Sequence, residues 1–200
     1  GMGWKVPYLH VDPSDIGRKF ERLIRINSQS GKGGIAWVLE RHFGIAVPKP
    51  MQPDISAVVQ DFSDRVHREV TPEEVRQLFD EHFVRPHGPF RLIGYWPRPD
   101  DRDPSHIHGE VRILVNDAER TLTGEGNGPV SAFVHCVRDL LGVEFAVEDY
   151  HEQYVPLKFS DGSVVYGVGI DANIDQAAVQ AIVSGLNRAS NAIAHRTAMR

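Results

Sequence analysis

Thr121-Leu-Thr-Gly-Glu-Gly-Asn-Gly-Pro129 and Val164-Val-Tyr-Gly-Val-Gly-Ile-Asp-Ala-Asn-Ile174 are the two stretches that decide the fold of this 200-residue chain. Each begins as a strand, passes through Gly-x-Gly and a short turn, and opens an apolar pattern with helical spacing. A helix N-terminus presents unpaired backbone N–H groups and a partial positive charge, so it attracts carboxylates and phosphates. Two such helix starts in one small domain predict a pseudo-symmetric site for a small anionic or zwitterionic ligand.

The residues around each stretch repeat one order of elements, which is three strands followed by a helix. The first copy has strand patterns at Phe90–Trp96, Ile107–Val115 and Arg120–Gly124, and a helix with apolar positions Val130, Phe133, Val134, Val137 and Leu141. The second copy has strand patterns at 143–150, 154–159 and 164–168, and a helix that follows Asn173. This order predicts an α+β fold in which residues 89–200 form a pseudo-twofold (βββα)2 domain.

Short polar segments predict where these elements turn or begin. Asn116-Asp117 predicts a hairpin turn between the second and third strands, and 97–104 predicts a loop after the first strand. Asn173 with Gln176 resembles a capping box at the second helix start.

The first part of the chain predicts an extended, proline-rich linker at 1–19 and a mostly helical linker subdomain at 20–88. Its predicted elements are a strand at 20–26, a Gly-rich turn at 27–34, a helix at 35–43 ending at Gly44, a helix over 55–66 with Asp54 as N-cap, and a helix opened by the capping box Thr71-Pro-Glu-Glu74.

Composition excludes several classes of protein. The hydrophobic fraction is 41% and the charged fraction 24%, which is ordinary for a globular protein, and the net charge of −5 argues against a nucleic-acid partner. No apolar run is long enough to span a membrane, and no signal peptide is expected. The single Cys136 rules out an internal disulfide, fits a reducing compartment such as the cytoplasm, and is expected to be a small buried residue. Gly1-Met2-Gly3 suggests that the chain begins inside a larger protein.

Three further groups invite a chemical interpretation. Gly31-Lys32-Gly33-Gly34 resembles a phosphate-binding loop only poorly, and a tight turn before a helix is favoured. His106-Ile107-His108 has a spacing that metals use, but no third ligand is near in sequence, so a surface strand start is favoured. An acid–base pair within Asp149, His151 and Glu152 is weighed against the solvated edge of a strand, and the strand edge is favoured.

Several of these segments resemble the long-form 2-isopropylmalate synthases. Phe20-Glu-Arg-Leu-Ile-Arg-Ile-Asn-Ser-Gln-Ser-Gly-Lys-Gly-Gly34 and Trp4-Lys-Val-Pro-Tyr-Leu9 are similar to that family's linker region. Gly124–Arg138 and Gly167–Arg188 resemble its C-terminal regulatory domain, which citramalate synthases also carry in a related form. The resemblance covers nearly the whole chain.

The resemblance implies that the parent enzyme condenses acetyl-CoA with 2-oxoisovalerate in leucine biosynthesis. The chemistry of this family takes place in a metal-dependent (β/α)₈ barrel of about 250 residues, for which this chain has no room. The fragment is therefore expected to hold no cofactor, to lack catalytic residues of its own, and to act with the N-terminal barrel of the same chain as a homodimer. Trp37 stands where the family usually has a tyrosine that approaches the partner's active site, and no catalytic role is carried over to it.

The resemblance also implies that L-leucine is an allosteric ligand. The positions that match the family's leucine site are Asn127, Gly128, Pro129, Val130, Ser131, Val147, Tyr150, Ala172 and Ile174. Helix starts are expected to take the carboxylate and the apolar side chains the isobutyl group, with the ammonium near Glu148, Asp149 or backbone carbonyls. The segment after Glu152 is shorter than in relatives, which have a loop that helps to cover the ligand.

Three alternatives remain open at this point. One is the regulatory domain of a citramalate synthase that senses isoleucine. Another is a dimerisation module that has lost ligand sensing, and the third is a nucleotide-binding protein built on the turn at 31–34.

Overall fold

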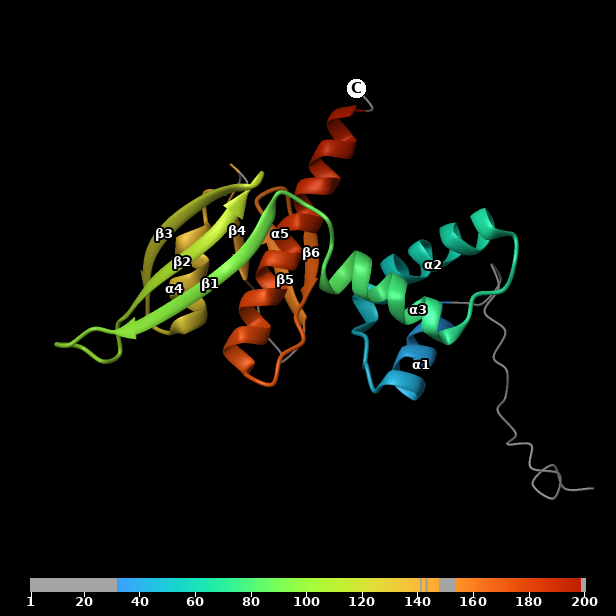
Figure 1. Cartoon of the computed structure of the whole chain (residues 1–200), viewed down its shortest axis with the longest axis horizontal. Coiled ribbons are helices and arrows are strands. Elements are labelled where there is room, and N and C mark those ends of the chain that lie inside the picture. Colours follow the sequence, from blue (N-terminus) through green and yellow to red (C-terminus); the bar gives the residue numbers. More distant parts are fainter. Residues whose placement is uncertain (1–31, 141, 143, 148–153, 199–200) are drawn as a thin grey trace, which may run out of the picture.

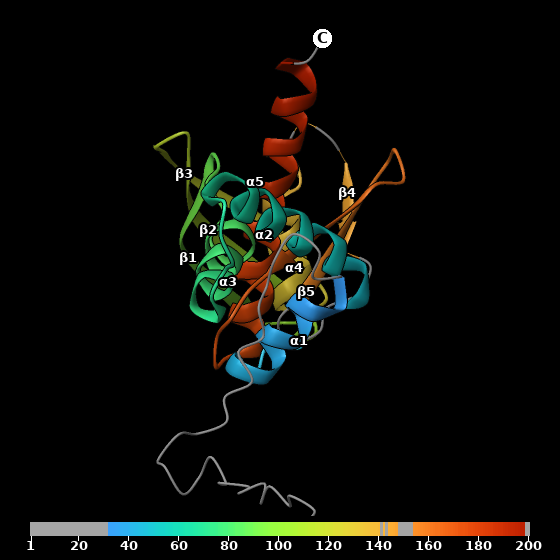
Figure 2. The same ribbon diagram turned by 90° about the vertical axis from the view of Figure 1, so that its right-hand side faces the viewer.

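The computed structural model describes residues 32–140, 142, 144–147 and 154–198. A group of helices lies beside two three-stranded antiparallel sheets that enclose two further helices (Figures 1 and 2). This arrangement confirms the predicted α+β class. The pseudo-twofold relation and the domain boundaries at 19/20 and 88/89 stay predictions. The linker at 1–19 and the strand at 20–26 lie outside the described residues.

The group of helices consists of three α-helices and two short turns. These are α1 (Lys32–Phe43), a 3-10 turn (Lys49–Met51), α2 (Gln52–Val66), α3 (Pro72–Phe79) and a π-helical turn (Asp80–Val84). Their apolar faces form one core, whose most buried members include Val38, Leu39, Ile55, Val75 and Phe79. Tyr154 and Val168 from the second sheet belong to the same core, so the helices and that sheet are packed together.

Two helix ends in this group follow the prediction. Gly44 ends α1 with a φ of +69°, the left-handed conformation that favours glycine after a helix. Thr71 Oγ1 accepts a hydrogen bond from the Glu74 N–H at 3.2 Å, and Glu74 Oε2 accepts one from the Thr71 N–H at 2.9 Å. The predicted capping box of α3 is therefore confirmed.

Two helix starts in this group differ from the prediction. Residues 32–34 form the first turn of α1 and are not part of a turn before it. Asp54 is not the N-cap of α2, because the helix begins at Gln52 and Met51 takes the N-cap position. The Asp54 carboxylate instead binds Arg188, which lies 134 residues further along the chain.

The first sheet contains β1 (Phe90–Pro99), β2 (Ile107–Val115) and β3 (Ala118–Gly126) in that order, and α4 (Pro129–Val137) follows. Asn116 and Asp117 form the predicted β2–β3 turn with φ angles of 49° and 63°. β1 continues into the segment that was predicted as a loop at 97–104. It is an edge strand, where proline is tolerated because one row of N–H groups needs no partner in the sheet.

The second sheet contains β4 (Phe145–Val147), β5 (Tyr154–Phe159) and β6 (Val164–Val168), and α5 (Ile174–Ala198) follows. The bounds of β5 and β6 are those predicted. Asn173 Oδ1 accepts a hydrogen bond from the Gln176 N–H at 3.1 Å, so Asn173 caps α5 as expected. No helix in the described part of the chain is both long enough and apolar enough to cross a membrane.

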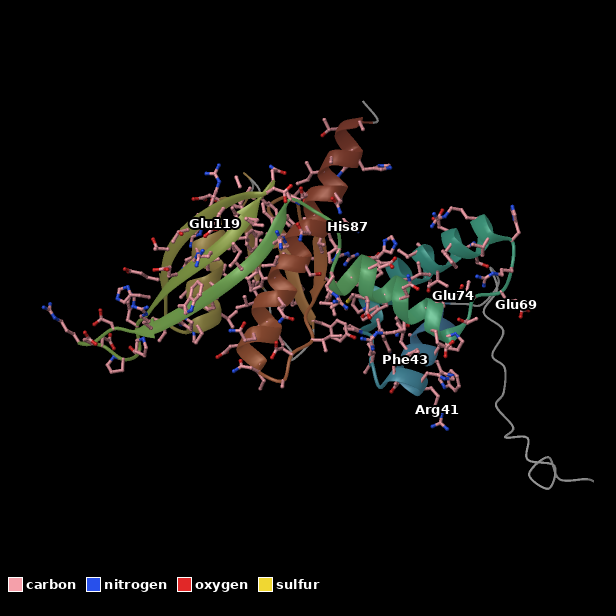
Figure 3. The ribbon with its side chains drawn as sticks, viewed as in Figure 1. Arg41, Phe43, Glu69, Glu74, His87 and Glu119 are labelled. Carbon is pink, nitrogen blue, oxygen red and sulfur yellow. The ribbon has the colours of Figure 1, made fainter. Side chains whose placement is uncertain are left out.

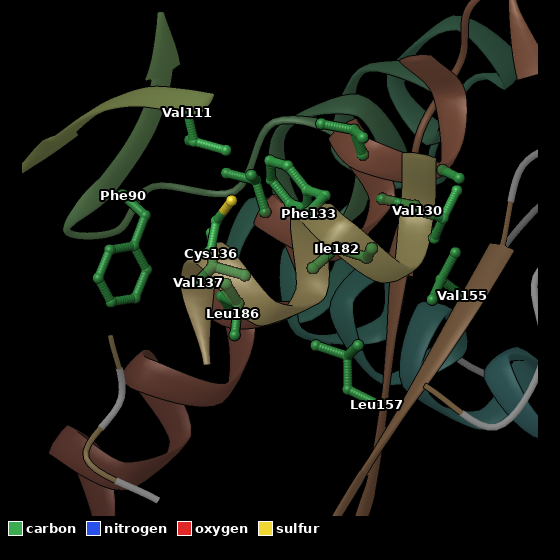
Figure 4. Packing of buried hydrophobic residues seen from close by; sticks show 14 of the residues in the cluster. Phe90, Val111, Val130, Phe133, Cys136, Val137, Val155, Leu157, Ile182 and Leu186 are labelled. Atoms are coloured by element: carbon green, nitrogen blue, oxygen red, sulfur yellow. The ribbon is translucent and has the colours of Figure 1, made fainter. Parts of the chain in front are cut away.

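α4 and α5 bury their apolar sides between the two sheets (Figures 2 and 4). Fully buried members of this core include Val111, Phe133, Val137, Leu157, Ile182 and Leu186. Since both helices and both sheets contribute to one core, the positions of the two helix starts are fixed by the same packing.

Polar side chains on α5 form hydrogen bonds with the segment that connects the group of helices to β1. Asn187 Nδ2 donates to the Phe90 carbonyl at 2.8 Å, and Asn187 Oδ1 accepts from the Phe90 N–H at 2.9 Å. One turn further along α5, Asn191 Nδ2 donates to the carbonyl of His87 at 2.6 Å; His87 lies in this connecting segment and is labelled in Figure 3. These bonds satisfy backbone groups where the chain leaves the helices and enters the first sheet.

Arg188 on the same helix joins three other elements. Its guanidinium donates to Asp54 Oδ2 on α2 at 2.8 Å and to the carbonyl of Tyr166 on β6. It also lies 4.4 Å from the centre of the Phe83 ring, in the turn after α3. The Arg188 side chain is only 16% exposed, so this contact is part of the packing between the helices and the second sheet.

Candidate ligand site at the two helix starts

The starts of α4 and α5 lie at the same end of the sheet–helix sandwich, at the lower edge in Figure 1. Tyr95 of β1 contacts the start of α4, because its hydroxyl donates to the carbonyl of Pro129. Burial is the main cause that raises the pKa of Tyr95 above its ordinary value, and Asp175 adds to the rise. No sequence pattern pointed to Tyr95, because an isolated tyrosine in a strand is usually a packing residue.

The start of α4 offers backbone donors without a side-chain cap. Gly128 is the N-cap in extended conformation, and among the described residues no side chain there caps the first turn and no acidic residue lies within it. The N–H groups of Val130 and Ser131 have no acceptor within the helix, and Pro129 has no N–H. A Cβ placed on Gly128 would meet nothing within 4 Å. This helix end can therefore receive an anionic group.

The start of α5 is already occupied by the protein's own polar groups. Asn173 caps the helix, and Asp171 accepts from the Asn173 N–H at 3.0 Å and from the Gln180 side chain at 3.0 Å. Asp175 adds a negative charge in the first turn. The two helix starts are therefore unequal, and the start of α4 is the better anion site. The Asp-x-Asn motif at 171–173 is the sequence signal from which this difference could have been predicted.

The residues predicted to line the ligand differ in their accessibility. At the start of α4, Asn127 is exposed, Gly128, Pro129 and Ser131 are partly buried, and Val130 is buried at 6% exposure. Val130 and the partly buried Val147 at the end of β4 pack against the same core. At the start of α5, Ala172 and Ile174 are exposed. Tyr150 lies outside the described residues, as do Asp149, His151 and Glu152, and the role of all these residues in binding stays a prediction.

The Gly-x-Gly pairs themselves have a packing role. A Cβ on Gly124 or Gly126 would lie 2.5 Å from a backbone nitrogen of α4. A Cβ on Gly167 or Gly169 would lie 1.7 or 2.0 Å from a backbone oxygen of α5. In both copies the absent side chains let a helix backbone approach a strand closely. The glycine pairs are thus accounted for by packing, and Gly128 is the position left open to a ligand.

His106 and His108 bind carboxylates at the surface of β2. Glu125 lies 3.1 Å from each imidazole, and Asp100 Oδ2 lies 2.9 Å from His108 Nε2. The hydrogen bond to Asp100 is the main cause that raises the pKa of His108. Over the described ranges, no group of three or more His, Cys, Asp and Glu side chains has an arrangement that could hold a metal ion.

Cys136 is buried on α4, as the sequence predicted. Its thiol is 7% exposed and donates to the carbonyl of Gly109 at 3.4 Å. Burial raises the pKa of the thiol to about 11, which keeps it protonated and unreactive.

Comparison with known proteins places this chain in a family. Residues 1–40 match the model described as alpha-isopropylmalate synthase, post-catalytic domain-like, and residues 69–190 match the model of the LeuA allosteric (dimerisation) domain. Similar proteins include the 2-isopropylmalate synthases of Ralstonia nicotianae, Pseudomonas entomophila and Clostridium acetobutylicum, at 37%, 39% and 38% identity. These matches cover 92%, 94% and 92% of this chain and 34%, 35% and 36% of the relatives, so the chain spans about a third of their length. Because the second model matches more than half of the chain, this protein belongs to the LeuA allosteric (dimerisation) domain family.

Proposed function

We propose that this chain is the regulatory and dimerisation part of a 2-isopropylmalate synthase and that it binds L-leucine at the start of α4. The observation that carries the proposal is the uncapped, unobstructed helix start at Gly128, in a domain whose family is described as allosteric. A free helix N-terminus favours a carboxylate, which every amino acid supplies.

The surroundings of this helix start suit the rest of a branched amino acid. Val147 and Ile174 provide apolar surface for the isobutyl group, and Ile174 is 53% exposed. Asp175 supplies a negative charge in the first turn of α5, where it can attract the ammonium group. Leucine bound in this way contacts both copies of the repeated unit, so binding stabilises one relative position of the two.

The parent enzyme is proposed to condense acetyl-CoA with 2-oxoisovalerate, with the divalent metal and the catalytic residues in a barrel outside this chain. The relatives that support this activity are about three times as long as the segment they share with this chain. Within the parent, the chain is proposed to form homodimers and to transmit feedback inhibition by leucine.

A thermal-shift comparison of leucine, isoleucine and valine tests the proposal. Leucine at about a hundredfold over its Kd is expected to raise the free energy of unfolding of this chain by about 2.7 kcal/mol, because it binds the folded state only. A larger rise with isoleucine would point to a citramalate synthase instead. A dimer that responds to none of the three would identify a dimerisation module without a sensor.

A further inference from the structure

A cavity of about 390 Å³ lies between the last turns of α5 and the turn that joins β5 and β6. This volume falls within the range of about 300–1,000 Å³ that is typical of small-molecule sites. α5 projects beyond the sheets at this end (Figure 1), and its residues 191–198 are exposed. At 1.5 Å per residue the cavity is roughly 30 Å along α5 from Ile174, so it is separate from the proposed leucine site.

The floor of this cavity is apolar. Phe159 and Val165 line it from the sheet, and Ala189 and Ile193 line it from α5. Phe159 and Ala189 are buried, whereas Ile193 remains 37% exposed. An exposed isoleucine beside buried apolar side chains leaves apolar surface that an aliphatic group can cover.

Two opposite charges stand at the rim of the cavity. Asp161 Oδ2 and Arg196 Nη1 are 3.9 Å apart, which is longer than a direct hydrogen bond. The Ser163 N–H and hydroxyl both donate to Asp161 Oδ1, at 2.9 and 2.5 Å, so the carboxylate is held in one orientation. The hydroxyl bond is also the main cause that lowers the pKa of Asp161, which keeps the group ionised at neutral pH.

We propose that this cavity binds an α-amino acid with an apolar side chain. Its carboxylate binds Arg196, its ammonium group binds Asp161, and its side chain covers the apolar floor next to Ile193. An α-amino acid carries its ammonium and carboxylate groups on the same carbon atom, which matches a guanidinium and a carboxylate that are close together but not hydrogen-bonded. A simple carboxylate or amine satisfies only one of the two. This second site lies beyond the proposed function and does not depend on it.

An NMR titration of the ¹⁵N-labelled chain with L-leucine tests the proposal. The backbone signals of Ser163, Val165 and Ile193 are expected to shift and saturate, separately from the signal of Ser131 at the other site. Arg196→Gln should lower the affinity for leucine at this cavity about tenfold or more, because a charge-assisted hydrogen bond is lost. Arg65→Gln is the matched control, since Arg65 is 65% exposed, Arg196 is 64% exposed, and each lies near an aspartate. 4-Methylpentanoate and 3-methylbutylamine, with one charge each, should bind more weakly than leucine.

Three outcomes would overturn the proposal: cavity signals that leucine does not move, shifts that Arg196→Gln leaves unchanged, or shifts that follow protein concentration and show that a second copy of the chain covers the cavity. The Ser131 signal reports leucine binding at the start of α4 independently. Absence of binding at one site can therefore be recognised whether or not the other site binds leucine.

Discussion

Replacing Gly167 with alanine is expected to lower the free energy of unfolding by about 3 kcal/mol, near the upper end of the usual cost of overpacking. The new Cβ would lie 1.7 Å from the carbonyl oxygen of Ala181 and 2.6 Å from the backbone nitrogen of Gly185. Both atoms belong to the backbone of α5, so neither moves without shifting the helix away from β6. For a chain of this size, such a loss corresponds to a fall in Tm of roughly 6–12 °C.

Gly33→Ala is the matched control for this prediction. Gly33 lies in α1, and a Cβ there would meet nothing within 4 Å. Alanine is the better helix former, so this variant should be as stable as the parent or more stable by less than about 1 kcal/mol. Urea unfolding followed by circular dichroism measures both variants. If Gly167→Ala unfolds at the same urea concentration as the unsubstituted chain, β6 and α5 do not make the close contact described.

Arg188→Ala is expected to cost about 2–3 kcal/mol of unfolding free energy. The variant loses the contact with the Phe83 ring and removes a donor from the Tyr166 carbonyl. The bond to Asp54 adds less, because the Asp54 side chain is 55% exposed and water can replace its partner. Asp54→Asn should therefore cost clearly less than Arg188→Ala in the same urea experiment.

Arg65→Ala serves as the comparison for Arg188. Arg65 and its partner Asp61 are 65% and 72% exposed, and an exposed pair of this kind contributes little. Equal stabilities of the Arg65 and Arg188 variants would show that Arg188 does not hold the helices against the second sheet.

Where a local pattern determined the structure, the sequence was sufficient to predict it. Alternation of apolar and polar residues predicted the bounds of β2, and the capping box of Thr71 and Glu74 predicted the start of α3. Local patterns failed where the partner is distant in sequence. Asp54 has the position of a plausible cap, yet its carboxylate binds Arg188, and nothing near Asp54 in sequence indicates this pairing.

The sequence predicted both helix starts of the candidate site, but it did not predict how they differ. Gly-x-Gly before each helix pointed to both helix starts, but the same glycines are needed for helix–strand contact, which only three-dimensional packing reveals. The spacing also suggested two equal helix ends, whereas Asp171 and Asn173 occupy one of them. The cavity beside Arg196 is formed by two separate segments, 159–165 and 189–197, and no local sequence pattern predicts that they meet.

Isothermal titration of L-leucine into the unsubstituted chain and into the Gly128→Asp variant tests most directly the central claim that leucine binds at the start of α4. The backbone at Gly128 is extended and a Cβ there has free space, so aspartate fits and the variant should keep its Tm. Its carboxylate is a good N-cap and takes the N–H groups that the ligand would use. The unsubstituted chain should bind leucine saturably, and the variant should lose the heat of leucine binding at the α4 site. Unchanged leucine affinity and stoichiometry in a folded Gly128→Asp would contradict it.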